Sequence, residues 1–200
     1  MLVVGLAFAA GMWLASRQAL DGRTVDGLLW PDPPALRPFQ LVDYDQRTLD
    51  LDRLRGRWSL VFFGFTHCPD VCPTALAALA SAQAELRERT LYGANGQVVF
   101  VSVDPERDSP DTLGRYVRHF SEDFVGATGP EADLKALTAA LGVLFMKVTQ
   151  GDGNYTVDHS AGIFFISPDL RLVSVLTPPQ TAADIVRRFV VVSEFIEAHG

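Results

Sequence analysis

Two continuous apolar runs stand out in the hydropathy pattern of this 200-residue chain. Residues 58–65, WSLVFFGF, and residues 97–104, QVVFVSVD, lack the polar alternation of a half-exposed strand. Unbroken runs of branched and aromatic residues are typical of strands that are buried on both faces. We therefore predict two central strands of a sheet at these positions.

Helical spacing of apolar residues follows each run. Residues 74–89 are rich in alanine and leucine, and residues 109–120 start with Ser-Pro-Asp and place their apolar side chains on one side. Residues 130–142 begin with proline and end with glycine, as helices commonly do. Residues 181–198 have an amphipathic pattern. The sequence thus predicts four helices.

Shorter stretches predict the remaining strands. Residues 39–43 and 48–54 are predicted as two short strands around a turn. LFMKVTQ and YTVDH flank a GDGN turn, and GIFFIS and LRLVSVL flank a Pro-Asp turn, so each pair predicts a hairpin. With a right-handed helical crossover between the central strands, this order predicts an α/β, thioredoxin-like fold with an insertion before the last β-hairpin.

The N-terminal run differs from the rest of the chain. The first 15 residues carry no charged side chain, but a helix that spans a bilayer needs about 20 apolar residues. No basic residue precedes the run, as one would in a secretory signal peptide. We expect residues 1–20 to be an uncleaved N-terminal membrane anchor, with a buried helix as the alternative. The proline-rich residues 21–37 are expected to be a linker or extended arm, and residues 38–200 the folded domain.

Composition excludes two classes of protein. The net charge is −7 and no cluster of Lys and Arg is present, which argues against a nucleic-acid partner. Two cysteines in 200 residues cannot form a disulfide scaffold. The two cysteines are therefore expected to have a local role.

Cys68 and Cys72 directly follow the first predicted central strand, in the stretch HCPDVC. Functional groups of open α/β sheets collect at the carboxyl ends of the strands. Pro73 suits the first position of a helix, which predicts that Cys72 is the N-cap and that its thiolate is favoured by the helix dipole. A disulfide, a metal site and an inert buried pair all remain open at this point.

A metal held by two thiolates needs a third ligand, and the chain has four histidines. His199 is expected to be solvated, His119 to have a surface or capping role, and His67 to point away from Cys68. His159 precedes the predicted strand GIFFIS, whose start the expected fold brings near the cysteines. Met146 is also a soft donor, but its place in LFMKV favours a core position.

Three ordered motifs, GFTHCPDVCPT, VSVDPERDSP and VDHS, resemble the Sco (SenC/PrrC) family of copper-binding, membrane-anchored, thioredoxin-like proteins that assemble cytochrome c oxidase. The resemblance covers about residues 38–198 and implies that Cys68, Cys72 and His159 bind a copper ion. Two thiolates and one imidazole suit Cu(I) and can also accept Cu(II). Asp158 and Asp104 are expected to lie behind these ligands and to support them.

The resemblance also implies a function: a copper metallochaperone that delivers copper to the binuclear copper site of cytochrome c oxidase. Its implied partners are the copper-accepting oxidase subunit and other copper chaperones. The alternatives are a dedicated thiol-disulfide oxidoreductase that reduces the acceptor's cysteines through a Cys68–Cys72 disulfide, and a copper or redox sensor. The absence of a transit peptide favours the bacterial inner membrane, with the soluble domain facing the periplasm. Three residues between the cysteines, instead of the usual two, disfavour general oxidoreductase activity.

Overall fold

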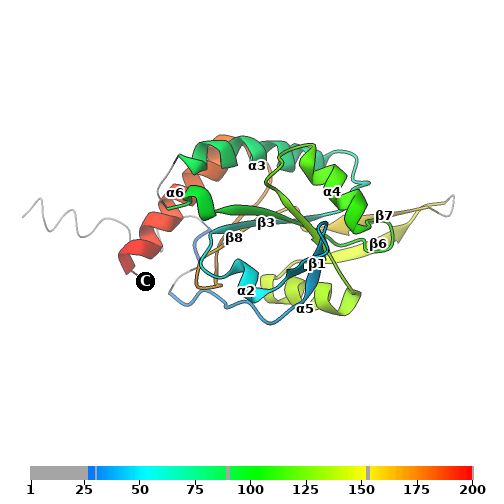
Figure 1. Cartoon of the computed structure of the whole chain (residues 1–200), viewed down its shortest axis with the longest axis horizontal. Coiled ribbons are helices and arrows are strands. Elements are labelled where there is room, and N and C mark those ends of the chain that lie inside the picture. The colour runs from blue at the N-terminus through cyan, green and yellow to red at the C-terminus, as the bar shows by residue number, and fades with distance from the viewer. Residues whose placement is uncertain (1–26, 30, 89–90, 152–153, 200) are drawn as a thin grey trace, which may run out of the picture.

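A mixed seven-stranded sheet forms the centre of the computed structural model, which describes residues 27–29, 31–88, 91–151 and 154–199 (Figure 1). The strands of this sheet are β1 (Leu41–Asp43), β2 (Thr48–Leu49), β3 (Ser59–Gly64), β4 (Gln97–Ser102), β5 (Val125–Thr128), β8 (Ile163–Ile166) and β9 (Leu172–Leu176). Their order across the sheet is β2-β1-β5-β4-β3-β8-β9. The strand pairs β3–β4 and β4–β5 are parallel, and the other neighbours are antiparallel.

Helices cover both faces of this sheet (Figure 1). They are α2 (Leu51–Leu54), α3 (Val71–Arg87), α4 (Pro110–Arg118), α5 (Glu131–Leu141) and α6 (Ala182–His199), with a short 3-10 turn at Gly93–Asn95. Helices α3, α4 and α6 pack on one face, and α2 and α5 on the other. The predicted α/β architecture with a central sheet is confirmed.

The two apolar runs are the central strands, as predicted, because both of their faces are covered. Every residue of β3 and of β4 is buried. Side chains alternate along a strand, so Leu60 and Phe62 join the core under α3 and α6, whereas Val61 and Phe63 join the core over α5. This double burial explains why the sequence shows no polar alternation at these positions.

The predicted hairpin before the last two strands forms a separate two-stranded sheet. Its strands are β6 (Phe145–Thr149) and β7 (Tyr155–His159), with Phe145 opposite His159 in the register. One face of this hairpin is open, so Met146 is 63% exposed, and the prediction that it lies in the core is wrong. The hairpin carries His159 at its end.

Two further details differ from the predictions. Residues 48–54 form the two-residue β2 and then α2, where the side chain of Asp50 caps the helix by accepting from the N–H of Arg53 at 3.1 Å. Strand β5 was not predicted at all. It is short and contains a glycine, and its hydrogen bonds to β4 and β1 depend on pairing that local sequence does not reveal.

The N-terminal arm lies along the edge strand β9. Leu28 and Ala35 form isolated bridges to Ser174 and Arg171, and Leu36 is buried. Residues 1–20, the predicted membrane anchor, lie outside the described residues. Within the part of the chain that is described, no helix combines the length and the apolar character needed to cross a membrane.

Candidate metal centre

Cys68 and Cys72 lie where the chain passes from β3 into α3. The N–H of Cys68 donates to the carbonyl oxygen of Phe65 at 3.2 Å, which turns the loop back toward the strand. The backbone N–H of Cys72 donates to the Sγ of Cys68 at 3.4 Å. Both cysteines are free thiols. The start of α3 therefore holds the two sulfur atoms close together.

The helix begins earlier than predicted, so Cys72 is not its N-cap. Asp70 is the N-cap, and Pro73 is the third helical residue, where its missing N–H breaks no intrahelical bond. Cys72 is fully buried. This burial, reinforced by the hydrogen bond to Cys68, raises the pKa of the Cys72 thiol far above its usual range. The prediction that the Cys72 thiolate is favoured is wrong while no cation is present.

Gly64, the last residue of β3, makes room for the Cys72 sulfur. A Cβ at this position would lie 2.7 Å from the Sγ of Cys72 and 2.9 Å from the Cε2 of Phe100. Both distances are below any normal contact between such atoms. The glycine of the GFTHCPDVC motif is therefore required by close packing under the helix start.

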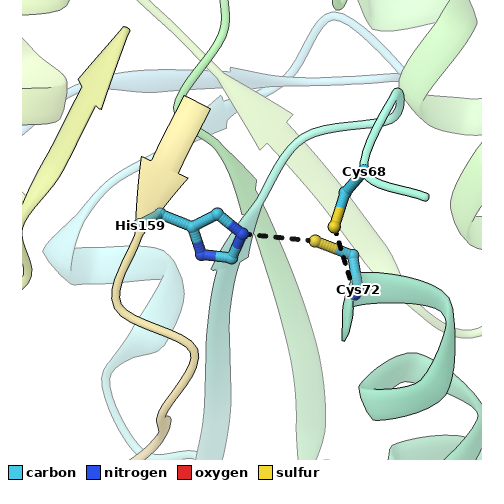
Figure 2. Close-up of side chains that lie close together, drawn as sticks. All are labelled: Cys68, Cys72 and His159. Carbon is cyan, nitrogen blue, oxygen red and sulfur yellow. Dashed lines mark hydrogen bonds between the residues drawn. The ribbon is translucent and has the colours of Figure 1, made fainter. Parts of the chain in front are cut away.

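His159 brings a third donor atom to the two sulfurs (Figure 2). Its Nε2 lies 3.5 Å from the Sγ of Cys72. The Sγ atoms of Cys68 and Cys72 and a ring nitrogen of His159 all lie within 4.8 Å of one another. Across the described ranges of the chain, this is the one group of three or more Cys, His, Asp or Glu donors with such spacing. The structure thus unites the three residues that the sequence singled out.

The imidazole of His159 is held in the orientation that a ligand needs. Its Nδ1 donates to the carbonyl oxygen of Ser160 at 3.2 Å, which leaves the lone pair of Nε2 directed at the sulfur of Cys72. The rings of Phe62 and Phe65 pack at right angles to the imidazole, at centroid distances of 6.3 and 5.9 Å. Burial lowers the pKa of His159, so the ring is in its neutral, metal-binding form at pH 7.

Asp104 connects the hairpin to the main sheet. It is fully buried, its carboxylate forms an ion pair with Arg107, and it accepts a hydrogen bond from the Oη of Tyr155 at 2.8 Å. The guanidinium of Arg107 stacks 3.8 Å from the centre of the Tyr155 ring and donates to the Tyr155 carbonyl oxygen at 2.9 Å. We call these three residues the clamp. Tyr155 and His159 are the two ends of the same strand, β7. The clamp therefore helps to fix the position of His159 without contacting it.

Asp158 lies on the other face of β7. Asp158 is exposed and lies opposite Met146 in the register of the hairpin, while the neighbouring His159 faces the sulfurs. The charge of Asp158 raises the pKa of His159, against the larger effect of burial. Asp158 therefore acts on the imidazole through its charge, and no hydrogen bond between the two side chains is present.

The other histidines lie outside this group. The His67 side chain is 58% exposed and contacts Thr66. His119 is the C-cap of α4, in agreement with the predicted capping role. His199 is exposed at the end of α6 and donates to the carbonyl oxygen of Phe195 at 2.9 Å. Sequence reasoning missed Arg107 and Tyr155, although the former stands in the quoted motif VSVDPERDSP.

Tyr155→Phe is expected to loosen the hairpin, because it removes the hydrogen bond to the Asp104 carboxylate and keeps the ring. Hydrogen bonds to charged groups contribute about 1.5–3 kcal/mol, so the free energy of unfolding should fall by about that amount. Hydrogen exchange should accelerate in β6 and β7. The control is Tyr44→Phe, which removes a 3.1 Å bond to the Phe124 carbonyl oxygen on another part of the sheet. Equal exchange rates in the hairpin of both variants would refute the clamp.

Comparisons with known proteins agree with this site. The family model described as SCO1/SenC matches residues 31–192. A putative copper-binding protein of Stutzerimonas stutzeri is 36% identical over 174 residues, covering 84% of this chain and 81% of that protein. The mitochondrial SCO1 homolog 1 of Arabidopsis thaliana is 38% identical over 136 residues, which cover 68% of this chain and only 40% of the relative.

A solved structure supports the same relationship. The crystal structure of Arabidopsis thaliana ScoI with copper bound superimposes with a TM-score of 0.73 at 32% identity, covering 82% of this chain and 99% of that one. The match to the family model extends over most of the sequence, from the N-terminal arm into α6. This chain belongs to the SCO1/SenC family.

Proposed function

We propose that this protein binds a copper ion through Cys68, Cys72 and His159 and delivers it to the copper-accepting subunit of cytochrome c oxidase. The observation that carries the proposal is the convergence of the three donor atoms within 4.8 Å. Relatives solved with copper bound, the Arabidopsis protein among them, support it.

The donor set fits copper. Metal bonds to imidazole nitrogen and thiolate sulfur measure about 2.0–2.3 Å, so two such donors on one ion lie within about 4 Å of each other. The 3.5 Å between the Sγ of Cys72 and the Nε2 of His159 meets this requirement without rearrangement. Thiolates are soft donors that select Cu(I). Three ligands leave a position at which an acceptor's ligand can attack.

Each residue has a defined part in loading and release. Burial keeps the Cys72 thiol protonated while the site is empty, so copper capture must release its proton. Cys68 is the partly exposed thiol and faces incoming ligands first. His159 stays neutral and is oriented by Ser160, so it can bind or leave the ion without proton transfer.

The second candidate function is reduction of the acceptor's cysteines. The close approach of the two free thiols favours it, since the N–H of Cys72 already contacts the Sγ of Cys68. The raised pKa of the Cys72 thiol speaks against attack by that residue. A copper or redox sensor would use the same thiol pair.

A transfer experiment separates these functions. The protein is loaded with one equivalent of Cu(I) and mixed with a reduced apo acceptor domain, and copper is quantified on both proteins after separation. Carrier function predicts that copper moves and that no thiols are oxidised. In a second reaction, the metal-free dithiol protein meets the disulfide form of the acceptor. Reduction there, with no copper transfer in the first reaction, would establish the oxidoreductase instead.

We also propose that residues 1–20 anchor the protein in a bacterial inner membrane, that residues 21–37 are a linker, and that residues 38–200 are the copper-binding domain in the periplasm. The uncharged run of the first 15 residues supports the anchor. Fractionation of cells that express the full chain or a variant without residues 1–20 tests it. Recovery of the full chain in the soluble fraction would contradict the anchor.

A further inference from the structure

A buried carboxylate lies behind the cysteine loop and has no part in the function described so far. Asp108 is 0% exposed and lies between β4 and α4. Within the described part of the chain, its one ion-pair partner is the half-exposed His67, whose Nδ1 is 3.8 Å away. A buried charge that no Lys or Arg neutralises is costly and persists only when hydrogen bonds satisfy it.

The hydrogen bonds to Asp108 come from the two segments that border the metal centre. Thr66 donates twice, from its N–H at 2.9 Å to Oδ2 and from its hydroxyl at 2.5 Å to Oδ1. Ser102, the last residue of β4, donates from its hydroxyl at 2.6 Å to Oδ2. Both carboxylate oxygens are therefore occupied, and they join the end of β4 to the residue that stands two positions before Cys68.

We propose that Asp108 is a positioning residue of the metal centre, whose buried carboxylate fixes the segment from Thr66 to Cys68 against the end of β4. It holds the Cys68 sulfur where Cys72 and His159 meet it. This inference rests on the proposed copper binding.

The test replaces the charge and keeps the shape, with Asp108→Asn in the full chain. Partners behind metal ligands typically change metal affinity by about 10- to 100-fold. We expect Cu(I) affinity, measured by competition with a chromogenic chelator, to fall by that factor. The thiolate-to-copper absorption band of the Cu(II) form should shift, because the Cys68 sulfur is no longer held in place.

A second measurement on Asp108→Asn, the thiol-disulfide equilibrium, needs no copper. In equilibrium with glutathione, two thiols of the protein reduce one oxidised glutathione and form the Cys68–Cys72 disulfide. Loosening the loop lowers the effective concentration of one thiol at the other. The equilibrium constant for disulfide formation should therefore fall several-fold in Asp108→Asn.

Asp43→Asn is the matched control. Asp43 is also a buried carboxylate, 1% exposed, and it accepts from the N–H groups of Asp45 and Arg47 at 2.9 Å and pairs with Arg53 at 2.6 Å. It lies on β1, which β5 and β4 separate from β3. This variant should lose stability but keep copper affinity and the disulfide equilibrium within about threefold of the original values.

Thr66→Val is the second variant. It removes the hydrogen bond from the Thr66 hydroxyl and keeps the charge of Asp108 and the hydrogen bond from the Thr66 N–H. Copper affinity and the equilibrium constant for disulfide formation should therefore both fall, but by less than in Asp108→Asn. If Asp108→Asn does not fold, the copper affinity and the disulfide equilibrium of Thr66→Val still test the proposal. Unchanged affinity and disulfide equilibrium in the folded variants would overturn the role of Asp108. Failure of the unmodified protein to bind copper would instead overturn the proposed function, and the disulfide equilibrium would still decide on Asp108.

Discussion

His159→Ala is expected to lower the affinity of the protein for Cu(I) by more than about 100-fold, because the loss of a direct ligand exceeds the effect of a supporting residue. The remaining two thiolates, one in the loop before α3 and one in its first turn, cannot complete a three-coordinate site. The measurement is competition with a Cu(I) chelator of known affinity. The Cys68–Cys72 pair should still oxidise and reduce, since His159 takes no part in the covalent bond.

His119→Ala is the control for this experiment. His119 caps α4 by its backbone and packs its ring edge-on against Phe120 at 5.2 Å. Its removal should leave copper affinity unchanged within about twofold, which is less than 0.5 kcal/mol. If His159→Ala bound copper as tightly as the unmodified protein, with the same spectrum, the three-residue site would be wrong.

Gly64→Ala is expected to lower the free energy of unfolding by about 1–3 kcal/mol, the usual cost of overpacking a core. The new methyl group would lie 2.7 Å from the Cys72 sulfur and 2.9 Å from the Phe100 ring, so at least one of them must move. Phe100 is fully buried in the core under α3. The Cys72 sulfur is therefore expected to shift, and copper affinity should fall together with stability.

Urea denaturation and chelator competition measure both effects. Gly151→Ala is the matched control, because a Cβ at Gly151 meets no atom within 4 Å. Its stability should remain within about 0.5 kcal/mol of the unmodified protein. Full stability and unchanged copper affinity in Gly64→Ala would show that the packing between β3 and the start of α3 tolerates a side chain.

Much of this architecture follows from local patterns. The central strands β3 and β4 were predictable because both faces of each strand are buried and leave an unbroken apolar run. The end of α5 was predictable because Gly142 adopts a left-handed conformation, with φ of 68°, that favours glycine. The three donor residues were found because their spacing matches their chemistry and because the chain resembles a known family.

The errors arose where neighbours across the fold decide the outcome. Strand β5 depends on pairing with β4 and β1, which lie far away in sequence. The exposure of Met146 depends on the hairpin standing apart from the main sheet. The pKa of the Cys72 thiol is raised chiefly by burial, which local sequence does not reveal. Residues such as Asp108 were overlooked because no single stretch of sequence shows which donors surround them.

The ligands are divided between the start of α3 and the β6–β7 hairpin, and this separation has a consequence for the lifetime of the protein. Cys72 and His159 are 87 positions apart in the chain. An ion bound to both would act as a reversible cross-link, and closing so long a loop restricts the unfolded chain strongly. The copper-bound protein would resist unfolding better than the metal-free protein. The metal-free protein would be the form that proteases attack first, so copper supply would affect its abundance.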